Sequence, residues 1–156
     1  LVPDYMTRVA EDGFYGWPWR YYGSHVDQRV DAPMPYDEDE VLTPDYALGA
    51  HTASLGLAWL GEGDDGADLP EPFSGGMIVG QHGSWNRDPL SGYKVIFVPF
   101  ADGEPAGAPV DLLTGFLSDD ESQAYGRPVG VLVEQDSGSV LVADDAGGRV
   151  WRVAGS

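Results

Sequence analysis

Short apolar runs follow one another from about residue 55 onward, and turn-forming residues separate them. Nearly every gap holds Gly, Pro, Asp or Ser, which is the pattern of β-strands joined by turns. The chain has 22 Gly and 12 Pro among 156 residues, and signals for helices are poor throughout. The sequence therefore predicts an all-β protein, with strands at residues 55–60, 76–80, 93–100, 110–117, 129–133, 140–143 and 150–153.

The predicted strands fall into two similar sets. HTASLGLAWL (residues 51–60) and GRPVGVLVE (residues 126–134) both place a polar residue before an apolar run that contains Gly. The two glycines, Gly56 and Gly130, are 74 positions apart, and two further apolar runs follow in each set. Sets of four strands that recur are typical of β-propeller blades, although this spacing exceeds the usual repeat of about 40–50 residues and requires long loops.

We therefore expect a partial β-propeller of four-stranded antiparallel sheets. Residues 1–23 would end one blade, 24–47 would form a long surface loop, 48–117 would form one blade, and 125–156 would supply three strands of the last blade. An incomplete ring leaves sheet edges and blade faces uncovered. This predicts a C-terminal fragment, about the last two blades, whose partners are the missing N-terminal blades.

The charge balance argues against one class of partner. There are 26 acidic residues against 8 Lys and Arg, which gives a net charge of −18. Because nucleic-acid binding relies on Lys and Arg to neutralise phosphates, we expect no nucleic-acid partner. Carboxylates can also bind calcium, but no D-x-D-x-D-G loop is present, so the acidic runs are interpreted as solvated loop charge.

Several other sites and segments are absent from the sequence. Without cysteine there is neither a disulfide framework nor a thiolate metal site. No apolar run approaches the ~18 residues of a membrane span, and the N-terminus lacks a signal-peptide pattern. The common hydrolase, phosphate-loop and dinucleotide-binding motifs are also missing.

Polar residues at predicted strand ends are the candidates for chemistry. His51 comes just before one strand and His82 just after the next, in QHGSWNR. In a propeller such ends gather at the mouth of the central channel. Arg127 opens a later strand, and Pro128 favours an extended backbone before it. Arg127 could merely cap a loop, but a guanidinium also presents a rigid fork that suits a planar carboxylate of an anionic ligand in the channel.

Several segments together resemble one enzyme family. They are FYGWPW, HTASLGLAW, GGMIVGQHGSWNR, GYKVIFVPF and YGRPVGVLVEQDSGSVLVADDAGGRVWRV. They are similar to the C-terminal part of the glucose/sorbosone dehydrogenases, above all to the L-sorbosone dehydrogenase-like branch. The resemblance implies a six-bladed propeller that uses pyrroloquinoline quinone (PQQ) and calcium to oxidise an aldose or sorbosone-like sugar. It also implies a periplasmic or secreted parent protein.

The resemblance further implies which residues contact the cofactor. Family members bind the PQQ carboxylates through arginine and lysine, and Arg127 matches such an arginine. The QHGSWNR turn lies where another contact is expected, and Asp144 is expected at the rim of the channel, with Asp145 forming only a turn. The implied cofactor-binding residues are Arg127, His82, His51, Trp85, Arg87 and Asp144.

Catalysis is not assigned to any residue of this chain. The general-base histidine of the family and its calcium ligands lie in an earlier blade, and none of the three histidines here matches that motif. We therefore assign no catalytic and no metal-binding residue, and we expect the chain alone to be inactive.

The alternative function is a non-catalytic propeller module that serves as an interaction surface. A propeller hydrolase with calcium-bound carboxylates is disfavoured, because no inward set of Glu, Asp and Asn is evident.

Overall fold

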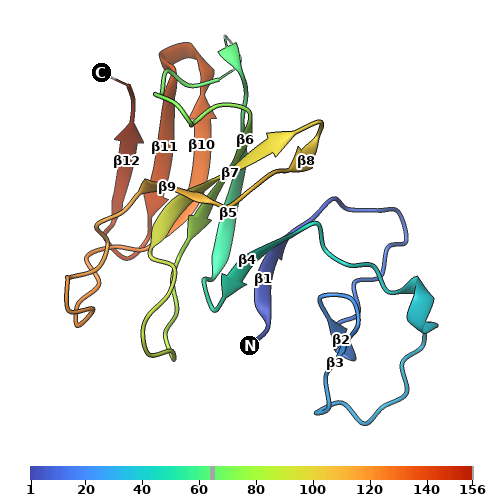
Figure 1. The fold of residues 1–156 in the computed structure, drawn as a ribbon. Helices are drawn as coiled ribbons and strands as arrows, with labels where there is room; N and C mark the ends of the chain where they lie inside the picture. Colours follow the sequence, from blue (N-terminus) through green and yellow to red (C-terminus); the bar gives the residue numbers. More distant parts are fainter. Residues whose placement is uncertain (64–65, 156) are drawn as a thin grey trace. The chain divides into compact units, whose positions relative to one another are not determined.

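The computed structural model describes residues 1–63 and 66–155 and consists mainly of antiparallel strands (Figure 1). Short 3-10 turns occur at Glu38–Glu40 and Gln135–Ser137. The prediction of an all-β protein is confirmed. The chain divides into two compact units, Leu1–Ala50 and His51–Ser156, and each is described by itself.

The first unit combines short strands with long connections. Strand β1 (Pro3–Met6) pairs with β4 (Tyr46–Ala50), and β2 (Arg20–Tyr21) pairs with β3 (His25–Val26), both antiparallel. The segment between β3 and β4 is largely exposed and contains the first 3-10 turn, and β3 itself lies within residues 24–47, which were expected to form a loop.

The second unit contains two antiparallel sheets. The first has the order β5-β6-β7-β9, and the short β8 pairs with the end of β7. The second has the order β10-β11-β12. The strand bounds are β5 Ser54–Leu60, β6 Gly76–Gln81, β7 Lys94–Ala101, β8 Glu104–Pro105, β9 Val110–Leu113, β10 Pro128–Glu134, β11 Ser139–Asp144 and β12 Arg149–Val153.

The seven strands predicted from apolar runs are all present, and one of them is shorter than predicted. Strand β9 ends at Leu113, four residues before the predicted end at residue 117. Its partner β7 begins at Lys94, and the last pair of the ladder joins Val95 to Leu113. The chain then leaves the sheet, and Leu117 instead forms a bridge with Ala124.

The hydrophobic core lies between the two sheets of the second unit. Its fully buried members come from both sheets: Leu60, Ile78, Val95, Phe97, Val140 and Val142. The sheets approach most closely where β5 meets β10. A Cβ atom added at Gly56 would lie 2.0 Å from the carbonyl oxygen of Val129, so only glycine fits there without a shift of the backbone. Close packing of the two sheets fixes the position of β10 and of the residue that precedes it.

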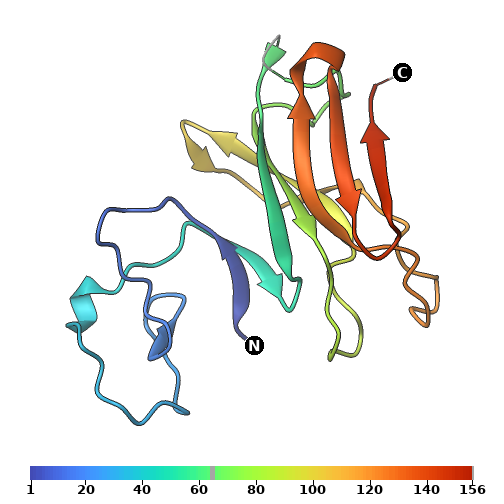
Figure 2. The ribbon, with the colours of Figure 1, turned by 180° about the vertical axis from the view of Figure 1, so that it is seen from behind.

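Antiparallel pairing brings several strand ends to one end of this unit. The starts of β5, β7, β10 and β12 lie beside the ends of β6 and β11. In Figures 1 and 2 the loop after β6 and the loop before β10 both extend from this end. Arg127, His82 and Asp144 therefore lie at the same end of the unit, as the sequence predicted for strand-end residues.

Candidate anion-binding site

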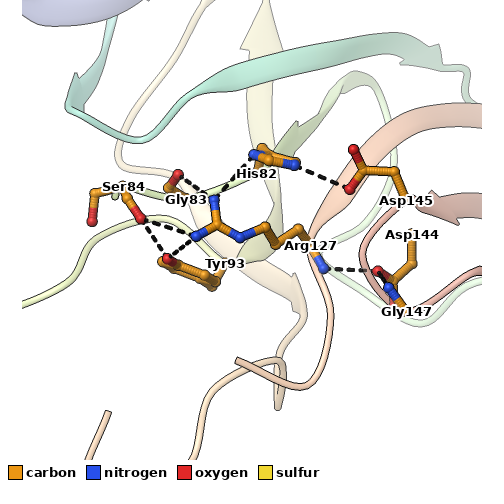
Figure 3. Close-up of polar contacts among 8 residues, drawn as sticks. All are labelled: His82, Gly83, Ser84, Tyr93, Arg127, Asp144, Asp145 and Gly147. Carbon is orange, nitrogen blue, oxygen red and sulfur yellow. Dashed lines mark hydrogen bonds and ion pairs between the residues drawn. The ribbon is translucent and has the colours of Figure 1, made fainter. Parts of the chain in front are cut away.

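Arg127 reaches from the start of β10 to the loop that joins β6 to β7 (Figure 3). Its Nη1 donates to Nδ1 of His82 and to the carbonyl oxygen of Gly83, both at 3.3 Å. Its Nη2 donates to the Tyr93 hydroxyl at 2.6 Å and to the carbonyl oxygen of Ser84 at 3.4 Å. Both terminal nitrogens of the guanidinium are thus held by groups of a single loop.

Tyr93 is the residue of this loop that holds Arg127 most closely. Besides accepting the 2.6 Å hydrogen bond, it places its ring centroid 4.7 Å from Cζ of Arg127, within the range of a cation–π contact. Tyr93 is only 4% exposed, and its hydroxyl donates to the carbonyl oxygen of Ser84. Its hydrogen is therefore already used, and the oxygen faces Arg127 as an acceptor.

His82 is held between Arg127 and Asp145. An arginine side chain can only donate, so Nδ1 of His82 must accept the hydrogen bond from Arg127. The hydrogen of the neutral ring then lies on Nε2, which donates to Oδ1 of Asp145 at 3.0 Å. This pair of contacts selects one tautomer of His82 and links the β6–β7 loop to the turn after β11.

The carboxylate of Asp144 holds the start of β10 and the turn after β11. It is 2% exposed. Oδ1 accepts hydrogen bonds from the backbone N–H groups of Arg127 at 2.8 Å and Gly147 at 2.7 Å, and Oδ2 accepts one from Nε1 of Trp151 at 3.2 Å. Burial alone would raise the pKa of Asp144, but these donors and the charge of Arg149 outweigh it and lower the pKa. Asp144 is thus buried, whereas the side chain of Asp145 contacts His82.

The charge of Arg127 is not paired with a carboxylate within the part of the chain that the structure describes. Other arginines form ion pairs there: Arg8 with Asp45, Arg20 with Glu38, Arg29 with Asp27 and Arg152 with Glu134. The guanidinium of Arg127 instead contacts an imidazole, two carbonyl groups and a phenol, all neutral. A half-buried cation with neutral partners attracts an anion, and it is unusual in a chain of net charge −18.

The remaining candidate residues, Trp85, Arg87 and His51, differ in exposure. Trp85 follows His82 in the same loop and is 82% exposed, and Arg87 is half-buried. His51 is exposed just before β5, and its carbonyl oxygen accepts a hydrogen bond from Ser91 Oγ at 3.2 Å. The structure thus brings His82 to the side chain of Arg127 and Asp144 to its backbone.

Tyr93, Ser84 and Asp145 belong to the cluster and were not predicted as site residues. Tyr93 was counted as the first residue of a strand, and Asp145 as a turn residue. One signal in the sequence was the pair Asp144-Asp145 after an apolar strand, since a single carboxylate would suffice to cap the turn.

Within residues 1–63 and 66–155, no group of three or more His, Cys, Asp or Glu residues is arranged to hold a metal ion. No described helix is long and apolar enough to cross a membrane.

Two antiparallel sheets packed against each other, as neighbouring blades are, define the class of protein: a segment of a β-propeller. Residues 36–156 match the TrAA12-like family model, and the chain belongs to the TrAA12-like family.

The chain is also similar to curated proteins. The chain is 35% identical over 155 residues to an uncharacterized protein of Borreliella burgdorferi, a match that covers 98% of this chain and 39% of that protein. It is 34% identical over 127 residues to a PQQ-dependent pyranose dehydrogenase of Coprinopsis cinerea, covering 70% of this chain and 16% of the enzyme. The chain therefore spans well under half the length of these relatives.

Solved structures support the propeller fold. The holo form of the PQQ domain of Coprinopsis cinerea pyranose dehydrogenase superposes with a TM-score of 0.63 at 24% identity, covering 89% of this chain and 39% of that one. The iodide structure of the Trichoderma reesei family AA12 enzyme gives a TM-score of 0.66 at 18% identity, with coverages of 90% and 38%. Its calcium structure gives a TM-score of 0.64 at 17% identity, with coverages of 88% and 37%. The predicted partial β-propeller is confirmed.

Proposed function

We propose that this chain is part of a PQQ-dependent sugar dehydrogenase and supplies one wall of its cofactor site, with Arg127 binding a PQQ carboxylate. The observation that carries the proposal is the half-buried guanidinium of Arg127, which has only neutral partners among the described residues. Homology to a PQQ-dependent pyranose dehydrogenase supports the cofactor and the sugar substrate. The finer choice of an L-sorbosone-like substrate rests on the sequence resemblance alone.

The residues at this end of the unit fit the chemistry of PQQ. PQQ is a flat tricarboxylate, and a planar cation, an imidazole and an exposed indole can bind its charges and its ring face. Arg127 would hold a carboxylate, while His82 and Trp85 would lie along the ring; Arg87 and His51 are further proposed contacts. Within the described parts of the chain the guanidinium bonds through Nη1 and Nη2, and Nε forms no hydrogen bond. When bound, PQQ supplies the two-electron acceptor for oxidation of the sugar.

We also propose where the catalytic base and the calcium site lie, where the whole protein is located, and how its blades divide. We assign the general base and the calcium ligands to blades outside this chain, so the chain alone would not oxidise sugars. Calcium is supported by the calcium structure of the Trichoderma reesei enzyme. A periplasmic or secreted location follows from the family resemblance. The blade division, with residues 48–117 as one blade and 125–156 as three strands of the next, is likewise a proposal.

One observation favours a second candidate function. Both terminal nitrogens of Arg127 already bond to the protein, so this residue could act only as a link between β10 and the β6–β7 loop. The chain would then be a non-catalytic propeller module that acts as an interaction surface. On this hypothesis Arg127 and His82 contribute nothing to PQQ affinity.

Calorimetric titration with PQQ separates the two candidates. We expect Arg127→Gln to weaken PQQ binding at least tenfold, since hydrogen bonds to charged groups contribute about 1.5–3 kcal/mol each. Arg152→Gln removes the same charge from the opposite end of the second sheet and serves as the matched control. Equal PQQ affinity for the wild type and Arg127→Gln, with both proteins folded by circular dichroism, would favour the interaction module.

A further inference from the structure

We propose that Tyr93 and Asp145 are positioning residues that hold the Arg127 guanidinium in its ligand-binding orientation, an inference that rests on the proposed anion-binding function. Tyr93 acts on Arg127 directly, and Asp145 acts through His82. Neither residue would touch the ligand. The four side chains form one chain of hydrogen bonds, Tyr93–Arg127–His82–Asp145 (Figure 3).

The conformation of Tyr93 is the first independent support. Its φ of 58° lies in the left-handed region, which is strained for a bulky side chain and persists where surrounding structure imposes it. The ring lies against Gly83, where an added Cβ would be 2.3 Å from a ring carbon. Gly83 itself has a φ of 96° and donates its N–H to the carbonyl oxygen of Thr52. The strained backbone at Tyr93 therefore places the Tyr93 hydroxyl next to the guanidinium of Arg127.

The hydrogen bonds of His82 are the second support. Its backbone N–H donates to the carbonyl oxygen of Ala53, and this hydrogen bond fixes the backbone of His82. The carboxylate of Asp145 then accepts from Nε2 and leaves Nδ1 as the acceptor for Arg127. If Asp145 lost its charge, the other tautomer would become accessible, and that tautomer would point an N–H group at the guanidinium.

The contacts of Tyr93 and His82 both restrict the conformation of the Arg127 side chain. Arginine has a long side chain with many rotamers, and a ligand that had to select one of them would bind more weakly. Tyr93 holds Nη2 and His82 holds Nη1, so the plane of the guanidinium is set before a ligand arrives. The bond from Arg127 N–H to Asp144 fixes the backbone of the same residue.

The test uses two isosteric variants, each with a control of the same chemistry. Tyr93→Phe removes the hydroxyl and keeps the ring, and Tyr125→Phe removes a hydroxyl from a half-exposed tyrosine two residues before Arg127. Asp145→Asn removes the charge beside His82, and Asp102→Asn removes one from the exposed turn after β7. Ligand-free ¹⁵N NMR at about pH 8, where an ordinary imidazole is neutral, reports the tautomer of His82 and hydrogen exchange of the Arg127 side chain.

We expect wild-type His82 to carry its hydrogen on Nε2 and Asp145→Asn to populate both tautomers. Tyr93→Phe should speed exchange of the Arg127 side-chain hydrogens. In calorimetric titrations with PQQ and with trimesate, an aromatic tricarboxylate, both variants should weaken binding about fivefold, and the two controls should match the wild type. Unchanged NMR spectra in both variants, or weaker binding that arises only from a lowered melting temperature, would overturn the proposal. If trimesate binds and PQQ does not, the PQQ assignment fails while the positioning roles stand.

Discussion

The hydroxyl oxygen of Tyr93 lies 2.6 Å from Nη2 of Arg127, although 34 positions separate the two residues along the chain. This contact joins the start of β7 to the start of β10, and therefore joins the two sheets of the second unit at the candidate site. The core between the sheets holds their positions. The hydrogen bond from Arg127 to Tyr93 therefore also fixes the orientation of the guanidinium.

The buried carboxylate of Asp144 should make stability depend on pH. Asp144→Asn would turn an amide N–H₂ toward either the two backbone donors or the Trp151 indole, so we expect a loss of about 2–3 kcal/mol at neutral pH. Because the folded pKa is lowered, this contribution is complete above the ordinary value of 3.8 and is lost as pH falls through the lowered pKa.

Chemical denaturation of the wild type and Asp144→Asn at a series of pH values checks this expectation. The difference in unfolding free energy between the two should shrink as the solution becomes more acidic than the ordinary pKa of aspartate. Asp102→Asn, at an exposed turn, should show little difference at any pH. A constant difference for Asp144→Asn across the acidic range would contradict the assigned role.

Gly56 should tolerate no side chain, because β5 and β10 approach so closely there. The Cβ of Gly56→Ala would lie 2.0 Å from the carbonyl oxygen of Val129 and would force the sheets apart, at a cost of about 3 kcal/mol. The matched control is Gly130→Ala on β10, whose Cβ would meet only the Ala143 Cβ at 3.8 Å. Equal denaturation midpoints for the two variants would show that the sheets do not pack in this way.

Truncation of a side chain in the core between the sheets should lower stability more than truncation on the outer strand β12. Val142 is fully buried in the core, whereas Val150 on β12 is 69% exposed. We expect Val142→Ala to lower the unfolding free energy by about 2 kcal/mol and Val150→Ala to change it by less than about 0.5 kcal/mol. Urea denaturation measures both, and a larger loss for Val150→Ala would place the core elsewhere.

Trp85 should contribute to ligand binding and not to folding. It follows His82 in the site loop and is 82% exposed, so its indole is available to stack on a flat ligand. Trp85→Ala is expected to weaken PQQ binding threefold to tenfold, by about 0.5–1.5 kcal/mol, and to leave the melting temperature unchanged. Trp17→Ala, which removes a 67% exposed indole from the first unit, should bind PQQ like the wild type.

Local patterns in the sequence predicted the strands and the strand-end location of Arg127 and His82, because alternation and turn residues act over a few positions. They could not predict the role of Tyr93, which depends on a left-handed backbone at that residue and on a loop folded against Gly83. The roles of Asp144 and Asp145 also required the structure. Asp144 ends β11 on the same buried face as Val140 and Val142, whereas Asp145 begins the turn and contacts His82.

The central claim is that Arg127 binds a carboxylate of PQQ, and a thermodynamic cycle tests it most directly. Calorimetry would measure the affinities of wild type and Arg127→Gln for PQQ and for its trimethyl ester, which keeps the ring system and loses the negative charges. We predict that Arg127→Gln weakens binding of PQQ at least tenfold and barely changes binding of the ester, so that the charge and the guanidinium are coupled by about 1.5–3 kcal/mol. An equal effect of the substitution on both ligands would contradict the claim.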